Sequence, residues 1–394
     1  MDPFVPARLG PIELRNRIIK AATFEGMSSS HRVSDSLIEF HEAFARGLVG
    51  LTTVAYCAVS PEGCGTKNEI VVTDETQEGF ARLARQIHDS KGKVSVQLGH
   101  AGAVATAAGL RGYSPSPIFS PVIMRRTLAL TRAQIYDVVR DFGRATKILK
   151  DANIDAVEVH VGHGYLLSEF LSPKLNRRKD EWGGDLPNRA RLARLVLEEV
   201  REQAGDSMAV IAKLNMVDAV SGGLGVPESI EVAKMFEADG NIDALVLTAG
   251  SSLQNPMFLF RGQVPLDEFA KNFKQPLRLG FRVFGKKFFR YFPYEEAYLL
   301  DLARQFRENL RIPLVLLGGI SNVATIYKAM DEGFEFVAMA RALLREPDLI
   351  AKYCDKLTSQ SACTHCNKCM PTIYTGTHCV LVDPSARPGL ALNL

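Results

Sequence analysis

Two imidazoles and a phenol lie within six residues of one another, at His160, His163 and Tyr165. They directly follow an apolar, strand-like run, residues 155–160. In α/β chains the residues at the carboxyl end of a strand face a crevice, and catalytic groups gather there. Two imidazole N–H groups can share one acceptor oxygen, and a phenol beside them can supply a proton. The cluster therefore predicts a site that polarises a carbonyl and protonates a neighbouring carbon.

The rest of the chain alternates apolar β-branched runs with amphipathic helical patterns. The predicted strands are Arg17–Ala21, Leu51–Val59, Val94–Leu98, Ala156–His160, Val210–Leu214, Ala244–Leu247, Pro313–Leu317 and Phe336–Met339. The predicted helices are Glu75–Ser90, Thr131–Ala152, Pro187–Gln203, Val226–Ala238, Tyr294–Asn309, Asn322–Asp331 and Pro347–Leu357. Eight strands separated by helices predict an α/β fold, a (β/α)8 TIM barrel, built as a single domain over residues 1–394.

Two insertions interrupt this alternation. Residues 113–130 follow the third strand and carry Pro115, Pro117 and Pro121. Residues 254–292 follow the sixth strand and are rich in Phe, Lys and Arg. Loops this long within a compact domain are usually functional. Because both would leave the C-terminal face of the barrel, we expect these inserted loops to roof the active site.

The composition excludes several classes of protein. Hydrophobic residues make up 46% and charged residues 23%, as in globular proteins with ample core. The net charge of +3 is too small to indicate nucleic-acid binding. Apolar runs stop well short of the ~20 residues that span a bilayer, and no secretory signal is visible. We therefore expect a cytoplasmic protein, alone or as a homo-oligomer, that binds neither nucleic acid nor membranes.

The segment from His160 to Arg189 resembles the old yellow enzyme family of FMN-dependent NAD(P)H oxidoreductases. The matching positions are His160, His163–Leu166, Phe170–Pro173, Asn176–Asp180, Gly183–Gly184 and Asn188–Arg189. The resemblance implies an FMN-binding TIM barrel that uses NAD(P)H to reduce activated alkenes in a ping-pong reaction. It also implies that His160 and His163 bind the carbonyl or nitro oxygen of the substrate, and that Tyr165 is the proton donor.

The same resemblance assigns flavin-binding positions near the strand ends. Ala22 and Thr23 end a motif that passes beside the flavin pyrimidine and N5, and Gln97 matches a glutamine along the isoalloxazine edge. Lys213 matches a cation near N1 and O2 that stabilises the anionic reduced flavin. The side chain next to flavin O4 is Phe24 in the ungapped register, or Thr23 after a one-residue shift.

Residues suited to a phosphate group follow the last two strands. Gly318 and Gly319 lead into a helix, so bare backbone N–H groups can approach an anion at a positive helix end. Ala340 and Arg341 supply a small residue and then a guanidinium suited to a bidentate phosphate contact. The family usually has glycine at position 340. These four residues therefore predict the site of the FMN phosphate.

Four cysteines near the C-terminus have the spacing of a soft-metal site: Cys363, Cys366, Cys369 and Cys379. The segment 362–394 that carries them is similar to the dienoyl-CoA reductase and trimethylamine dehydrogenase branches of the family, which bind a [4Fe–4S] cluster. Those branches continue into large FAD/NAD domains, and this sequence ends at Leu394. A [4Fe–4S] cluster, zinc and free thiols are the three alternatives.

Two other functions stay open beside the reduction of alkenes. The first is a flavin-dependent amine or ether dehydrogenase that passes electrons through the cysteine site. The second is a non-catalytic flavin-binding redox module. A phosphate-binding barrel without flavin is a more distant alternative.

Overall fold

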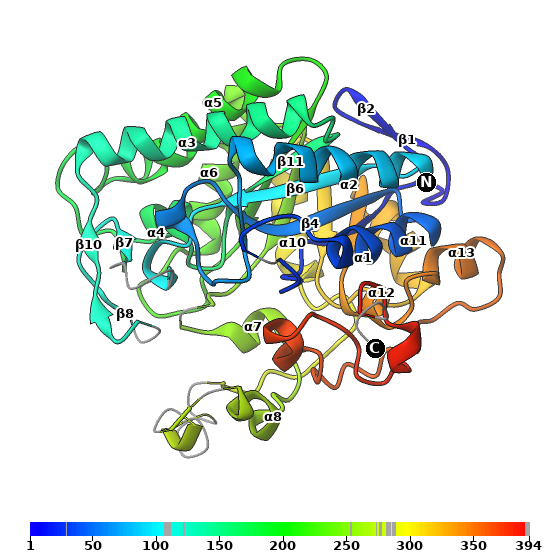
Figure 1. The fold of residues 1–394 in the computed structure, drawn as a ribbon. Helices are drawn as coiled ribbons and strands as arrows, with labels where there is room; N and C mark the ends of the chain where they lie inside the picture. Colours follow the sequence, from blue (N-terminus) through cyan, green and yellow to red (C-terminus); the bar gives the residue numbers. More distant parts are fainter. Residues whose placement is uncertain are drawn as a thin grey trace.

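The computed structural model describes residues 1–390, apart from 29, 106–111, 121–122, 253, 273, 276–277, 281–284 and 286–288. In these residues the central sheet has nine parallel strands, of which eight form the barrel and the ninth, β5 (Ile70–Val71), pairs with one of them (Figure 1). The eight barrel strands follow. In chain order they are β3 (Ile18–Lys20), β4 (Leu51–Ala58), β6 (Val94–Gly99), β11 (Ala156–Val161), β12 (Ala209–Asn215), β13 (Ala244–Thr248), β14 (Leu314–Leu317) and β15 (Phe336–Met339). Because β3 pairs with both β15 and β4, the sheet closes on itself. The prediction of a TIM barrel is confirmed.

Apolar side chains fill both sides of the barrel wall. All eight residues of β4 are buried, as expected for a parallel strand covered on its two faces. The antiparallel hairpin of β1 (Ala7–Leu9) and β2 (Ile12–Leu14) packs its Leu9 and Leu14 with strand residues such as Ile211 in one buried cluster. The hairpin therefore closes one end of the barrel interior, and the other end remains for a functional site.

Helices surround the barrel, as Figure 1 shows. They are α1 (Asp35–Arg46), α2 (Gln77–Asp89), α3 (Arg132–Asp151), α5 (Leu186–Ala204), α6 (Val226–Asp239), α10 (Leu300–Asn309), α11 (Val323–Asp331) and α13 (Leu349–Cys354). Helix α1 was not predicted, and α10 begins six residues later than the predicted start at Tyr294. The start of α3 was predicted correctly: Thr131 and Gln134 form a reciprocal capping box. In the described part of the chain no helix is long and apolar enough to cross a membrane.

The insertion at residues 113–130 contains four short strands, in the pairs β7–β10 and β8–β9. They are β7 (Tyr113–Ser114), β8 (Phe119–Ser120), β9 (Arg125–Arg126) and β10 (Leu128–Ala129). The insertion at residues 254–292 contains α7 (Pro256–Phe260) and α8 (Leu266–Lys271). Pro121 and several positions of the second insertion lie outside the described residues.

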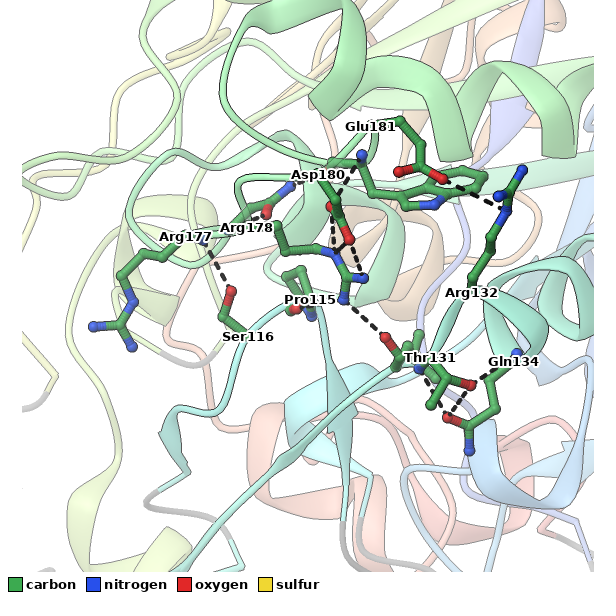
Figure 2. Close-up of polar contacts among 12 residues, drawn as sticks. Pro115, Ser116, Thr131, Arg132, Gln134, Arg177, Arg178, Asp180 and Glu181 are labelled. Carbon is green, nitrogen blue, oxygen red and sulfur yellow. Dashed lines mark hydrogen bonds and ion pairs between the residues drawn. The ribbon is translucent and has the colours of Figure 1, made fainter.

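A single guanidinium ties down the first insertion (Figure 2). Nη1 of Arg178 donates to the carbonyl of Pro115 at 3.1 Å and to that of Leu130 at 2.8 Å, near the two ends of the insertion. The carboxylate of Asp180 accepts from Nε and Nη2 of Arg178 and holds it in place. Nearby, the Asn176 amide donates to the backbone carbonyls of Phe170 and Trp182. The Asn176–Asp180 part of the family motif is therefore structural support for the loop.

Candidate active site

The residues predicted to do chemistry meet at the carboxyl ends of β6, β11 and β12. In the strand register Glu158 stands beside Gln97, and His160 stands beside Lys213. Because side chains alternate along a strand, Glu158 and His160 point to the same face. All four side chains are buried. The structure thus brings three of the predicted site residues together: Gln97, His160 and Lys213.

The two imidazoles touch through one nitrogen of each ring. Nε2 of His160 lies 3.1 Å from Nδ1 of His163. On its other side His160 accepts a hydrogen bond from the backbone N–H of Gly162, at 3.2 Å from Nδ1. His160 therefore carries its proton on Nε2 and donates it to His163. His163 then carries its proton on Nε2, which lies 2.7 Å from the hydroxyl of Thr248.

Both imidazoles are neutral at ordinary pH. Burial lowers the pKa of His160 well below its usual value, and the neighbouring His163 ring and the Lys213 ammonium add to this effect. Burial and Lys213 likewise lower the pKa of His163 to about 3. A neutral imidazole has one donor and one acceptor, so the direction of each hydrogen bond depends on its tautomer.

The phenol of Tyr165 lies beside this pair. Its ring stacks on Tyr56, with centroids 5.0 Å apart, and meets the His160 ring edge-on at 4.8 Å. Burial and the charge of Glu69 raise the pKa of Tyr165, and a hydrogen bond with the Ser252 side chain works in the opposite direction. Tyr165 therefore keeps its proton at neutral pH and can give it up only to a strong base.

Lys213 is held by an acidic partner that the sequence analysis missed. Its Nζ lies 2.7 Å from Oε1 of Glu158, and both side chains are 3% exposed. The same oxygen accepts from Nε2 of Gln97 at 2.6 Å. Since breaking a buried pair leaves an uncompensated charge, this arrangement fixes the ammonium and the amide in place. The alternation Val157-Glu158-Val159-His160 was the available signal for Glu158.

A second buried network holds the segment that follows β3. Nζ of Lys20 lies 3.1 Å from the carboxylate of Glu25, and Nε2 of His41 lies 3.2 Å from it. Ala22, between Lys20 and Glu25, packs against a buried cluster that includes Tyr56, and Tyr165 packs against the same cluster. Thr23 and Phe24 follow, each partly exposed. The segment predicted to border the flavin therefore begins just after β3, where Ala22 and Tyr165 share one cluster.

The glycine loop after β14 has the shape expected for an anion cradle. Gly318 and Gly319 have φ values of +113° and +74°, and a Cβ on Gly319 would lie 2.7 Å from the Tyr298 ring. The Tyr294 hydroxyl donates to the Gly319 carbonyl at 2.9 Å. Glu296 accepts from both the N–H and the hydroxyl of Ser321, each at 2.6 Å. These contacts occupy the residues before α10 and explain its late start.

Ala340 and Arg341 follow β15, the neighbour of β14, at the start of the short helix α12 (Arg341–Arg345). The Arg341 side chain hydrogen-bonds Tyr298, which packs on Gly319, and Asn367 of the C-terminal segment. The four predicted phosphate residues are thus neighbours. The left-handed glycines, the guanidinium and the buried cation at Lys213 fit an FMN molecule at this end of the barrel.

The four C-terminal cysteines line one cavity together with Arg341. None of the four forms a disulfide: Cys363, Cys366, Cys369 and Cys379. Burial raises the pKa of Cys369 to about 11, although the charge of Arg341 opposes this shift. Among the residues described by the structure, no three His, Cys, Asp or Glu side chains are arranged to hold a metal ion.

The barrel, the glycine loop and the buried lysine together define an FMN-binding oxidoreductase. Residues 2–254 match the model of the NADH:flavin oxidoreductase / NADH oxidase family, and the chain belongs to this family, that of the old yellow enzymes. It is an oxidoreductase of the FMN- and NAD(P)H-dependent type.

Among curated proteins, the chain is 50% identical over 382 residues to a 4,4'-dithiodibutanoate disulfide reductase of Rhodococcus erythropolis, covering 96% of this chain and 95% of the relative. It is 32% identical to an NADPH dehydrogenase of Bacillus subtilis (strain 168), over 66% of this chain and 76% of that one. It is 28% identical to an NADH oxidase of Thermoanaerobacter brockii over 88% of this chain, but spans only 49% of that relative.

Solved structures agree on the fold. A 2-naphthoyl-CoA reductase superposes with a TM-score of 0.83 at 23% identity, over 97% of this chain and 57% of the other. An old yellow enzyme homologue from Zymomonas mobilis superposes with a TM-score of 0.73 at 22% identity, over 95% and 99% of the two chains. At these identities the likeness concerns the fold alone.

Proposed function

We propose that this protein uses NAD(P)H to reduce activated C=C bonds, in α,β-unsaturated carbonyl or nitro compounds. The observation that carries this proposal is the 3.1 Å contact between Nε2 of His160 and Nδ1 of His163, with the Tyr165 ring beside it. Two nitrogens that lie this close can share one substrate oxygen. Bound FMN supplies the two-electron transfer between NAD(P)H and the acceptor.

Binding of such an oxygen requires a change of tautomer at His163. The Thr248 hydroxyl now accepts from Nε2 of His163, but a hydroxyl can also donate. Once Thr248 donates, the His163 proton sits on Nδ1, and both imidazoles present N–H groups to the same point. The oxygen gains negative charge as the C=C bond is reduced, so each aimed donor contributes about 3 kcal/mol to the transition state.

Tyr165 then supplies the proton that the α-carbon needs. Its raised pKa keeps the hydroxyl protonated until a carbanion-like centre forms next to it. The stacking on Tyr56 fixes the ring and limits its rotation. The proton donor and the oxygen-binding pair are therefore held on one rigid surface.

A second candidate function is the reduction of organic disulfides. The observation that favours it is the 50% identity with a protein named 4,4'-dithiodibutanoate disulfide reductase. Reduction of a disulfide by NAD(P)H and one proton gives two thiols, so a proton must reach the departing thiolate. Tyr165 is the candidate donor in this reaction also.

The two proposed functions differ in the electron acceptor, so an experiment with an alkene and a disulfide separates them. FMN-loaded protein is reduced anaerobically with NADPH and then mixed with cyclohex-2-enone or with 4,4'-dithiodibutanoate, and the products are identified. We expect reduction of the enone, slowed about 100-fold by His160→Ala or His163→Ala, in keeping with the loss of one aimed donor. Reduction of the disulfide alone would replace the first proposal by the second. An FMN that NAD(P)H cannot reduce would overturn both and favour a redox module.

The four C-terminal cysteines are the candidate ligands of an iron–sulfur cluster. They have the spacing of a soft-metal site, and all four line one cavity. We infer that these thiolates hold a [4Fe–4S] cluster in the iron-loaded protein. Iron and sulfide analysis of anaerobically prepared protein tests this, with zinc and metal-free thiols as the contrary results.

A further inference from the structure

We propose that Arg261 forms an anion-binding subsite at the mouth of the barrel and receives a carboxylate of the electron-accepting substrate. The inference rests on the proposed function, because it concerns the acceptor that the same site reduces. It names a chemical class for that acceptor: an alkene or a disulfide that carries a carboxylate.

Arg261 is a partly buried cation with three aromatic rings beside it, which form an aromatic cage. Its guanidinium carbon lies 4.4 Å from the ring centroid of Phe258, 5.4 Å from that of Phe292 and 5.2 Å from that of Tyr298. Its buried Nε has no hydrogen-bond partner among the described residues. Burial lowers the pKa of Arg261, with weaker opposing effects from Tyr298 and Glu295. No carboxylate of the described chain forms an ion pair with it, so part of its donor capacity is unused.

The backbone of Arg261 adds an independent observation. Its φ is +55° and its ψ is 162°, a combination that residues other than glycine rarely adopt. The conformation is held from both sides: the Arg261 N–H donates to the carbonyl of Met257, and the Asn367 amide donates to the Arg261 carbonyl at 2.6 Å. Strain that the surroundings maintain is typical of functional positions.

The cage lies close to the oxygen-binding histidines. Thr248, the partner of His163, ends β13, and Gly250 follows it by two residues. A Cβ on Gly250 would lie 3.4 Å from Cβ of Phe258, whose ring covers Arg261. On the opposite side, Tyr298 packs against Gly319. Arg261 is therefore linked through Phe258 to the chain that leaves β13 after Thr248, and through Tyr298 to the glycine loop.

A guanidinium in this setting favours a carboxylate. Its fork of N–H groups matches two carboxylate oxygens, and the rings exclude water from its faces, so the pair is stronger than one in open solvent. Three anions could use the same chemistry: the acceptor carboxylate, the FMN phosphate and a coenzyme phosphate. The flavin phosphate already has the glycine loop and Arg341, so the proposal assigns Arg261 to the acceptor carboxylate, and the test below separates this anion from the coenzyme phosphate.

The test compares charged and neutral versions of one acceptor on oxidised, FMN-loaded protein. Affinities are read from the change in flavin absorbance, which needs no turnover, for 4,4'-dithiodibutanoate and its dimethyl ester and for 2-methylmaleate and its dimethyl ester. We expect Arg261→Gln to weaken binding of the carboxylates tenfold or more and to leave the esters within twofold. Arg261→Lys keeps the positive charge, so its affinity for the carboxylates should fall less than that of Arg261→Gln.

Arg290→Gln is the matched control, because this exposed guanidinium lies 5.8 Å from the Phe292 centroid without a cage of its own. An equal loss of carboxylate affinity in Arg290→Gln would show that positive charge in general attracts the carboxylates. There would then be no specific subsite, and the proposal would be overturned. Unchanged carboxylate affinity in Arg261→Gln would also overturn it. Loss of FMN would assign the anion to the flavin, and slower reduction by NADPH alone would assign it to the coenzyme. If the carboxylates bind through Arg261 but no acceptor is turned over, the proposed function fails and the subsite stands.

Discussion

The hydroxyl of Thr248 lies 2.7 Å from Nε2 of His163, where it can accept a hydrogen bond from that nitrogen or donate one to it. The two residues come from different strand ends. The backbone N–H of His163 also donates to Oδ1 of Asn215, at 3.0 Å, and this bond helps to hold the residue in place. Thr248 can switch between accepting and donating. The pair can therefore bind a substrate oxygen without any change in charge.

Thr248→Val should weaken the binding of phenol, a mimic of an enolate oxygen, about tenfold. Valine has the shape of threonine but cannot donate to Nε2, so the His163 proton stays on the wrong nitrogen. Phenol binding is measured from its charge-transfer absorbance with oxidised FMN. Thr248→Ser keeps the hydroxyl and should bind phenol like the parent protein. Equal binding by the valine variant would show that His163 does not hold the oxygen.

Tyr165→Phe should slow the transfer to the alkene by about 10²–10⁴-fold, because a general acid contributes an effect of that size. Reduction of FMN by NADPH should stay nearly intact, since that step needs no proton donor. Stopped-flow absorbance separates the two half-reactions. Tyr136→Phe, at a half-exposed position on α3, is the control. Equal slowing of both half-reactions would assign Tyr165 a structural role.

Arg341→Ala should lose FMN during purification while the barrel stays folded. Removing one charge-assisted pair to a phosphate costs about 1.5–3 kcal/mol of binding. Flavin content is measured by absorbance, and folding by circular dichroism. Arg345→Ala removes a guanidinium from the same helix and cavity lining, and it should keep its flavin. Stoichiometric FMN in Arg341→Ala would place the phosphate elsewhere.

Ser substitution of Cys363 and Cys366 should lower the thermal stability of the iron-loaded protein but spare turnover with NADPH and an alkene. Thiolate–metal bonds stabilise a segment that has little core of its own. Cys354→Ser, at an exposed cysteine away from the cavity, is the control. Lost turnover with flavin still bound would instead favour a dehydrogenase that passes electrons through the cysteines.

The buried neutral histidines should lower the stability of the protein as the pH falls from about 6.5 to 4. Burial lowers the pKa of His41 and of His100 to about 4, and that of His163 to about 3. In this window the unfolded chain binds protons at these histidines that the folded chain does not, so their contribution to the free energy of unfolding falls as pH falls. Burial raises the pKa of Glu69 to about 7, which acts in the opposite direction, so the histidine contribution is read as a difference between variants. Urea titrations of the parent protein and of His100→Asn, at pH 7 and pH 5 with FMN saturating, measure that difference. The asparagine can still accept from Gly102, so His100→Asn should lose less stability between the two pH values than the parent, and an equal loss would contradict the buried neutral state of His100.

The sequence predicted the barrel well because its strands are apolar runs that need no knowledge of partners. The sequence also contains signals that indicate helix α1: Ser34 as N-cap, and Leu37, Phe40 and Phe44 on one face. The start of α10 was not readable in the same way, since it depends on contacts of Tyr294 and Glu296 with a distant loop.

The site residues also fall into two groups: those that a local pattern indicates and those that only the folded chain brings together. His160, His163 and Tyr165 lie in one short motif, and the glycine pair follows a strand, so local patterns found them. Glu158 was readable from strand alternation, whereas its pairing with Lys213 spans 55 positions of the chain. Thr248 and Arg261 belong to no motif, and only the closed barrel brings them near the histidines.

The hydrogen bonds from the Arg178 guanidinium to the insertion at residues 113–130 affect how ligands can reach the site. Both ends of residues 113–130 are fastened to one immobilised guanidinium, so the base of this insertion is fixed. In the proposed reaction, coenzyme and acceptor take turns at one flavin, and we expect both to enter and leave across another part of the rim. In the insertion that follows β13, the carbonyls of Arg261 and Gln263 accept from Asn367 of the C-terminal segment, and we expect the route in to pass this cysteine-bearing segment.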